Sequence, residues 1–288
     1  MRTRLHQDAV AFLASAEPFF ETDPFSANVI AVVAARVVAT GETARRGRLW
    51  LTVHDGAGHV VGLGMHTPPH PLFVSRMPQA ASVALADALA DDGHEISGVN
   101  GASESTGAFA ETWSARTGQT STVITAMRMY RLEKLTRPRA VSGSASLALA
   151  PSDVDLVANW LAAFHDEATP HAPNEDEATF AQRRIAAGQI HLWQDEGNPV
   201  SLAAVSAPAS GVARIGPVYT PAPLRRKGYG AAVTAEATEA AIQAGAEHVV
   251  LYTDLANPTS NSIYQAIGYR PDHDAEERVF RSASGEPL

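Results

Sequence analysis

The stretch PAPLRRKGYGAA, residues 221–232, decides how the whole chain is interpreted. It follows the strand-like run VARIGPVYT at 212–220 and opens an alanine-rich run with the composition of a helix. The first amides of a helix lack intrahelical partners and carry the positive end of its dipole, so they attract anions. Gly228 and Gly230 remove side chains that would keep a phosphate from those amides. The positive charges beside them belong to Arg225, Arg226 and Lys227.

The simplest alternative is a solvated charged turn that binds nothing. Two better-known phosphate loops are excluded by spacing, because a Walker loop needs G-x-x-x-x-G-K-[ST] and a Rossmann fingerprint needs G-x-G-x-x-G. The glycines of this stretch stop at Gly230. The stretch therefore predicts an anion site of another kind, between a strand and a helix.

The composition makes this basic cluster a local exception. The chain has 288 residues, of which 45% are hydrophobic and 18% charged, and its formal charge is −9. These values describe a globular protein and argue against a general nucleic-acid binder. Without cysteine, disulfides, zinc–thiolate sites and thiol nucleophiles are excluded. No run approaches the roughly 18 apolar residues of a membrane span, so we expect a cytoplasmic protein with neither a membrane nor a nucleic acid as partner.

A domain boundary is predicted at LTRPRAVSGSASL, residues 135–147, where Pro138 precedes a tract rich in glycine and serine. We expect one domain over residues 1–137, a linker over 138–146 and a second domain over 147–288. Each domain then has an ordinary size. The two halves also show the same weak order of elements, which indicates an internal duplication.

The second half alternates strands with helices, as in a mixed α/β layer. Spacing and capping residues predict helices at 152–168, 174–188, 229–244 and 257–268. Apolar and β-branched runs predict strands at 146–150, 189–194, 199–207, 212–220, 248–255 and 278–281.

The first half repeats this order. The N-terminal 20 residues are interpreted as a first amphipathic helix, and a second helix is expected at 26–40. A strand pair is expected within 48–67, turning at Asp55-Gly56. The remaining expected elements are a helix at 79–93, a strand at 94–101, a helix at 104–118 and a strand at 121–135.

Two motifs together make the sequence similar to a known family. VYTPAPLRRKGYGAA resembles the pyrophosphate-binding motif of the GNAT superfamily of acyl-CoA-dependent N-acetyltransferases, whose core is [R/Q]-x-x-G-x-[G/A]. DLANPTSNSIYQAIGY resembles the family's N-x-x-[A/S]-x-x-x-Y-x-x-x-G-[F/Y] segment. The first is filled by Arg225, Gly228 and Gly230, and the second by Asn257, Ser260, Tyr264, Gly268 and Tyr269. Both occur in order, separated by one helix and one strand, and the resemblance covers the second half of the chain.

The resemblance implies two tandem GNAT-like domains of the α/β class, each a twisted mixed sheet flanked by helices. It also implies that the end of the 212–220 strand splays from its neighbour and binds the pantetheine arm, that the glycine loop holds the pyrophosphate, and that two asparagines bind pantetheine. The coenzyme-binding residues are then Val218, Tyr219, Thr220, Arg225, Arg226, Lys227, Gly228, Tyr229, Gly230, Asn257, Asn261 and Tyr264.

The resemblance also implies that Tyr264 is a catalytic residue. It would protonate the departing thiolate, a task that suits a tyrosine with a pKa near ~10. The alternative is that Tyr264 only packs its helix on the sheet.

The general base stays open. Members of the family often place a glutamate on the fourth strand, and VARIGPVYT contains none. Glu236 is expected to face solvent. His191, Asp254 and a chain of water molecules remain as candidates.

The acceptor pocket is implied to lie near the first two helices of the second half, with Phe164, His165 and Glu167 as substrate contacts. His165, Asp166, Glu167 and His171 also form a cluster, but their spacing fits no tight metal-ligand pattern, so no metal is expected.

The first half lacks a counterpart of the basic glycine loop at residues 225–230. At the corresponding place the chain has HTPPHPLFVSRMPQAA, with no glycine before the helix. The domain at 1–137 is therefore expected to be a degenerate GNAT-like domain without the pyrophosphate loop. Its role would be structural, or it would shape the acceptor pocket.

These inferences predict an N-acetyltransferase that moves an acetyl group directly from acetyl-CoA to a primary amine. The acceptor is a small amine, an aminoacyl compound, or a protein lysine or N-terminus. The alternatives are a noncatalytic acyl-CoA-binding sensor and a nucleotide binder, and a homodimer is left open. Gly228→Glu is expected to abolish coenzyme binding while leaving the fold intact.

Overall fold

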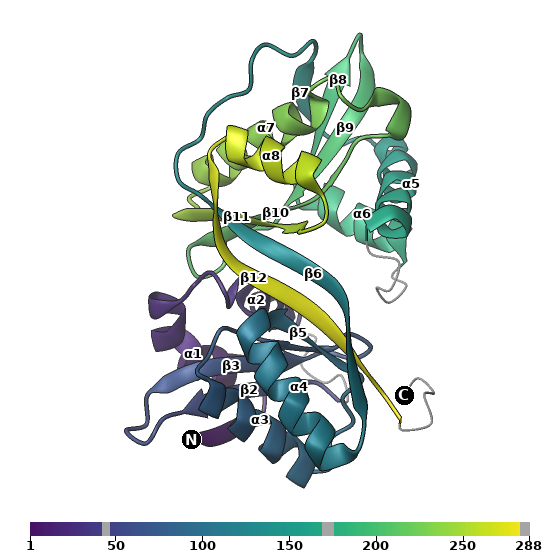
Figure 1. The fold of residues 1–288 in the computed structure, drawn as a ribbon. Coiled ribbons are helices and arrows are strands. Elements are labelled where there is room, and N and C mark those ends of the chain that lie inside the picture. The colour runs from purple at the N-terminus through teal and green to yellow at the C-terminus, as the bar shows by residue number, and fades with distance from the viewer. Residues whose placement is uncertain (42–46, 169–175, 283–288) are drawn as a thin grey trace. The chain divides into compact units, whose positions relative to one another are not determined.

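The computed structural model describes residues 1–41, 47–168 and 176–282 and divides the chain into two compact units (Figure 1). Unit 1 contains Met1–Met127 and the C-terminal segment from His273, and unit 2 contains Arg128–Asp272. This division differs from the boundary expected between 137 and 147. The reason is that two long strands, β6 (Thr120–Leu132) and β12 (Tyr269–Arg281), each begin in one unit and end in the other.

Unit 1 is a mixed sheet with helices on both faces. Its strands follow the order β1-β2-β3-β4-β5-β12. β4 and β5 are parallel, and the other pairs are antiparallel. Besides β6 and β12, its elements are β1 (Arg2–His6), α1 (Ala9–Thr22), α2 (Asn28–Thr40), β2 (Leu49–His54), β3 (Val60–His66), β4 (Leu72–Val74), α3 (Gln79–Asp91), β5 (Gly98–Ala102) and α4 (Ser103–Thr117).

Unit 2 repeats this plan with the strand order β7-β8-β9-β10-β11-β6. β10 and β11 are parallel, while β7, β8, β9 and β10 pair antiparallel. Its elements are β7 (Ser144–Leu147), α5 (Pro151–Ala168), α6 (Glu177–Ala186), β8 (Ile190–Asp195), β9 (Asn198–Val205), β10 (Val212–Tyr219), the 3-10 turn η1 (Ala222–Leu224), α7 (Tyr229–Gln243), β11 (His248–Asp254) and α8 (Pro258–Ala266).

The mixed α/β class with helix-flanked sheets is confirmed, and both units have the element order βααβββαβαβ. The predicted N-terminal helix was wrong at its start. Arg2–His6 form a strand paired antiparallel with β2, and α1 begins only at Ala9, where the Asp8 side chain accepts the Ala11 amide at 2.8 Å. An aspartate cap stops a helix from extending toward the N-terminus, which frees the preceding residues to pair as a strand.

The last strand is much longer than the expected 278–281. β12 begins at Tyr269, and its residues Ala275–Val279 pair antiparallel with β5. Polar residues fill its first half, so no apolar alternation marks a strand there. Sheet pairing, and not side-chain pattern, makes this segment a strand.

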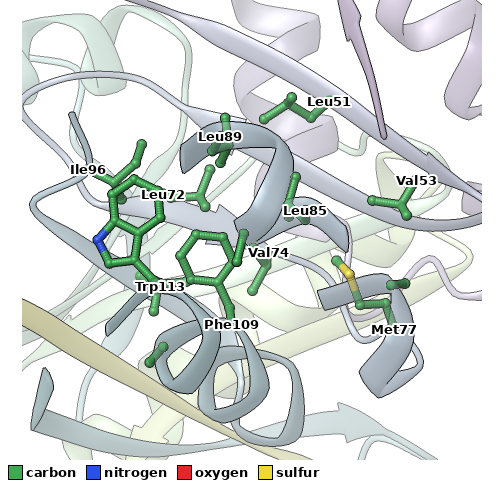
Figure 2. Packing of buried hydrophobic residues seen from close by; sticks show 14 of the residues in the cluster. Leu51, Val53, Leu72, Val74, Met77, Leu85, Leu89, Ile96, Phe109 and Trp113 are labelled. Carbon is green, nitrogen blue, oxygen red and sulfur yellow. The ribbon is translucent and has the colours of Figure 1, made fainter. Parts of the chain in front are cut away.

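The core of unit 1 lies between the sheet and α3 and α4. Phe109 and Trp113 of α4 stack with ring centroids 5.8 Å apart, and Leu85 and Leu89 of α3 pack beside them (Figure 2). On the opposite face, the Phe12 ring of α1 lies 5.4 Å from the Trp50 ring of β2.

Unit 2 buries a separate cluster on each face of its sheet. On one face, small and branched residues of α7, such as Val233 and Ala237, pack against Ala213 and Ile215 of β10. On the other face, α5 and α6 cover Leu192 and other apolar residues of β8 and β9. No helix in the described part of the chain is long and apolar enough to cross a membrane.

The pairing of β5 with β12 generates a stability prediction. A Cβ on Gly98 would lie 2.4 Å from the main-chain oxygen of Arg278 in β12. Gly98→Ala should therefore push the two strands apart and cost about 1–3 kcal/mol, the usual penalty of overpacking. Urea unfolding measures the change. Gly56→Ala is the control, because nothing lies within 4 Å of its Cβ position; equal losses in the two variants would contradict the close approach.

Candidate functional site

The strand β10 loses one of its two neighbours halfway along. Its parallel pairing with β11 covers Val212–Ile215 and ends there. After a register shift, Val218 and Tyr219 remain paired with β9 on the other side. Main-chain groups of β10 beyond Ile215 therefore have no sheet partner on the β11 side within the described residues. This is the splayed geometry that the family resemblance implied for the strand end.

The loop between β10 and α7 has an unusual backbone. Arg226 and Gly228 both adopt left-handed conformations, with φ of +65° and +89°. α7 begins at Tyr229, and no side chain of the described residues caps it. The first amides of α7 are consequently open to an anion, and the left-handed residues shape a concave main-chain surface before them.

Side chains far away in the sequence hold this loop. The hydroxyl of Thr220 lies 2.8 Å from Ser201 Oγ of β9. The buried Tyr229 hydroxyl donates to Asp195, which also accepts from Ser142 Oγ at 2.5 Å. These two hydrogen bonds, with the charge of Lys227, keep the pKa of Asp195 below its ordinary value. The Tyr229 side chain therefore anchors the loop, and its main-chain amide is the group left for a ligand.

Gly228 is constrained more tightly than the sequence suggested. Besides its left-handed φ, a Cβ at this position would lie 2.9 Å from Val141 Cγ2. Any side chain there is strained, so the expectation that Gly228→Glu leaves the fold intact is not supported. Gly230 is the better position for a test, because its nearest neighbour, Thr220 Oγ1, is 3.4 Å from the Cβ position.

Arg225 turns its side chain to the protein. Its Nε donates to the Thr220 carbonyl at 2.8 Å and its Nη2 donates to Glu167 Oε2 at 2.6 Å. The other oxygen of Glu167 accepts from the Tyr219 hydroxyl at 3.2 Å, and burial together with this carboxylate raises the pKa of Tyr219. Glu167, expected as a substrate contact, ties α5 to the loop before α7.

The other two expected substrate contacts also have partners inside unit 2. Phe164 packs against the cluster under α5 and α6. His165 Nδ1 lies 2.5 Å from Glu177 Oε1 of α6. His171 lies outside the described residues. Within the described ranges no three histidine or acidic side chains gather as a metal site would require.

The asparagines of the second motif have distinct positions. Asn257 caps α8, and its Oδ1 accepts the Ser260 amide at 3.0 Å. Asn261 Nδ2 donates to the Asp254 carbonyl at 3.2 Å, whereas its Oδ1 is buried with no hydrogen-bond partner among the described residues. A buried acceptor without a donor is costly, so this oxygen suits a ligand that brings an N–H.

Tyr264 lies at the edge of the core beneath α7. It packs against that cluster together with Val218 of the splayed strand. Its ring centroid is 6.4 Å from that of Tyr269 in an edge-to-face arrangement, and the Tyr269 hydroxyl is itself hydrogen-bonded to Thr238 Oγ1 at 2.7 Å. Burial raises the pKa of Tyr264 to about 12, so its hydroxyl is protonated at neutral pH.

The two candidate bases come from β8 and from the end of β11. His191 alternates with Ile190 and Leu192, which face α5 and α6, so its side chain points toward α7. Burial lowers its pKa, and the charge of Glu236 on α7 opposes that shift. Asp254 is exposed and caps its own turn by accepting the Ala256 amide at 2.7 Å.

Sequence reasoning missed the residues that hold the loop by hydrogen bonds, namely Ser142, Asp195 and Ser201. The hydrogen bonds that they make span between 19 and 53 positions of the chain, a separation that no local pattern encodes. A buried serine in an apolar strand was the one available signal, since buried polar groups require partners.

At the corresponding place in unit 1, side chains bond the main-chain amides before the helix. Between β4 and α3 the Arg76 amide donates to Ser26 Oγ, and the Met77 amide donates to Ser105 Oγ, each at 3.0 Å. The Met77 side chain also occupies the space beside Gly62. Side chains therefore satisfy the two amides before α3, whereas the corresponding amides of Arg226 and Lys227 in unit 2 have no such partner among the described residues.

Comparison with known proteins agrees with this geometry. Residues 154–269 match the model of the acetyltransferase (GNAT) family. This range contains β10, the loop, α7 and α8. No curated protein matches the chain.

Solved structures share the fold along nearly the whole chain. A GCN5-related N-acetyltransferase from Sphaerobacter thermophilus is 17% identical, with 99% of this chain and 97% of that chain covered and a TM-score of 0.62. One from Kribbella flavida is 20% identical, with 88% and 95% covered and a TM-score of 0.56. A Drosophila protein is 13% identical, with 96% and 98% covered and a TM-score of 0.66. At these identities the likeness establishes the fold.

The burial of Tyr264 predicts a pH dependence of stability. Its pKa of about 12 in the folded chain exceeds the ordinary value of about 10. The folded state therefore holds this proton more tightly, and the resulting stabilisation is complete below about pH 10 and is lost as the pH rises toward 12. Tyr264→Phe lacks this loss. Between about pH 9 and about pH 11 the wild type should lose free energy of unfolding relative to the variant in urea titrations; parallel pH profiles would contradict the assignment.

Proposed function

We propose that unit 2, whose residues 154–269 match the acetyltransferase (GNAT) family, is an acyltransferase that transfers an acetyl group from acetyl-CoA to a primary amine. One observation carries the proposal. The uncapped start of α7 lies directly after the end of β10 that has left β11. An anionic head and a polar arm of one ligand can therefore bind to adjacent main-chain groups.

The coenzyme groups that we assign follow from the open main-chain and side-chain atoms. The amides from Arg226 to Gly230 would bind the pyrophosphate, and the free edge of β10 around Val218 would bind the pantetheine amides. The orphaned Oδ1 of Asn261 supplies an acceptor for a pantetheine N–H. Arg225 would act indirectly, since its guanidinium holds the loop through Thr220 and Glu167.

The reaction needs a neutral amine that attacks the thioester carbonyl. The C–N bond forms, the C–S bond breaks, and a main-chain amide of β10 would stabilise the oxyanion. Tyr264, protonated at neutral pH because burial raises the pKa of its hydroxyl, would give its proton to the departing thiolate. We assign no side chain as base; a water molecule would take the ammonium proton.

The remaining expectations for the chain belong to the same proposal. The proposed substrates are acetyl-CoA and one of three amines: a small amine, an aminoacyl compound or a protein amine. We propose no metal and a location in the cytoplasm. A homodimer is left open. Unit 1 is proposed to be a degenerate GNAT-like domain, since the amides before α3 are bonded to serine side chains.

Gly230→Glu tests the anion site. A carboxylate beside the first amides of α7 would repel a diphosphate and occupy its donors, so acetyl-CoA affinity should fall by about 100-fold or more. Isothermal titration calorimetry measures the affinity. Gln243→Glu places the same charge at the exposed far end of α7 and should leave affinity unchanged. Equal affinity in the Gly230→Glu variant and the wild type would remove the anion site from the proposal.

Tyr264→Phe tests the role of the hydroxyl. Loss of a general acid should lower kcat by about 100-fold or more while the acetyl-CoA dissociation constant changes little. Thiol release with a panel of amines measures turnover. A similar loss in both quantities would reduce Tyr264 to a packing residue, and binding without turnover of any amine would overturn the proposed transfer.

A further inference from the structure

An arginine lies in the middle of an otherwise apolar strand. In β10, Ala213 and Ile215 are buried in the cluster under α7. Side chains alternate between the two faces of a strand, so Arg214 points to the opposite face. After the register shift, Tyr219 lies on that same face, in the cluster packed by α5 and α6. Arg214 therefore belongs to the face of the sheet that α7 does not cover.

The side chain of Arg214 has no anionic partner in the described ranges 1–41, 47–168 and 176–282. Its main-chain amide donates to Ser206 Oγ at 2.9 Å, but its guanidinium makes no hydrogen bond or ion pair with those residues. Burial lowers the pKa of this guanidinium, and the phenol of Tyr252 opposes that shift. Arg214 is thus a partly buried cation without a carboxylate beside it in those ranges.

Two other arginines of unit 2 are paired with carboxylates. Arg225 Nη2 lies 2.6 Å from Glu167 Oε2, and Arg137 Nη1 lies 3.6 Å from Glu236 Oε2. These pairs are accessible to solvent, where a partner is least needed. A partly buried charge without a partner is much more costly to maintain, and a bound anion would offset that cost.

The position of Arg214 connects it to the open end of β10. Its neighbour Ile215 makes the last pair with β11, opposite Leu251. On the α7 face this point is filled by core side chains. An acceptor that reaches a thioester at the opening from the other face would meet Arg214.

We propose that Arg214 binds an anionic group of the acceptor, so that the acceptor is an amine that also carries a carboxylate or a phosphate. The guanidinium presents two parallel N–H donors, which match the oxygens of either group. The inference rests on the proposed acetyl transfer and adds the second functional group of its acceptor. Arg214 is a specificity residue in this role, and it takes no part in proton transfer.

Matched acceptors test the inference. Each ω-amino acid in a series of chain lengths is paired with its carboxamide, and aminoethyl phosphate is paired with ethanolamine. In the wild type the anionic member of each pair should have the higher kcat/KM. The pair with the largest ratio of anionic to neutral kcat/KM shows whether the site prefers a carboxylate or a phosphate. Arg214→Met should lower kcat/KM for anionic acceptors by about 10- to 100-fold, the loss of a charge-assisted hydrogen bond, with little change for neutral ones. Arg214→Lys should retain part of the preference.

Controls separate this inference from the proposed function. Arg183→Met removes an exposed charge that lies over the Phe180 ring and should leave the preference intact. Acetyl-CoA affinity should be unchanged in the Arg214→Met variant, and its unfolding temperature should stay the same or rise, because a partly buried charge is removed; this excludes misfolding. An equal loss for both members of a pair, or no loss, would overturn the role of Arg214 while acetyl transfer stands.

If no amine is acetylated, the proposed function fails. Binding of the anionic amines is then measured by the change that they cause in the unfolding temperature. The anionic amines should then raise the unfolding temperature of the wild type in the presence of CoA, and not that of Arg214→Met. The same shift in both proteins, or no shift in either, would overturn the inference.

Discussion

The site in unit 2 depends on one event in its sheet, the end of parallel pairing between β10 and β11 after Ile215. A continuous pairing would satisfy the main-chain groups of Gly216–Tyr219 on both sides and leave none for a ligand. The register shift against β9 keeps the strand attached on its other edge. The chain then enters the loop before α7 at the place where unpaired main-chain groups of a strand and of a helix meet.

The open loop keeps its shape because side chains outside it supply its hydrogen bonds. Ser201 holds Thr220, Asp195 holds Tyr229, and Glu167 holds Arg225. Each of these contacts uses a side chain of the loop and leaves its main-chain amides open. The arrangement places rigid anchors on strands and a helix, and reserves the backbone for recognition of an anion.

Unit 1 has the same order of elements without an open loop. The amides of Arg76 and Met77 before α3 are bonded to serine hydroxyls, and Met77 fills the space beside Gly62. The two units thus share the plan βααβββαβαβ, while the loop of unit 2 combines two left-handed residues, Arg226 and Gly228, with an uncapped helix. The fold alone does not make the site, and a few residues at one strand-to-helix connection decide it.

The sequence alone determined what is local. Apolar periodicity located most helices and strands, Gly228 and Gly230 indicated an open loop before a helix, and the cap at Asn257 followed from the order of its neighbours, because these features depend on residues within one or two turns. Only the tertiary structure decided which strand edges and side chains meet. The first strand at Arg2–His6, the pairing of Ala275–Val279 with β5 and the bond from Arg225 to Glu167 all join positions that are far apart in the chain. Main-chain donors and acceptors are nearly the same in every residue, so their partners are chosen by the packing of the whole chain.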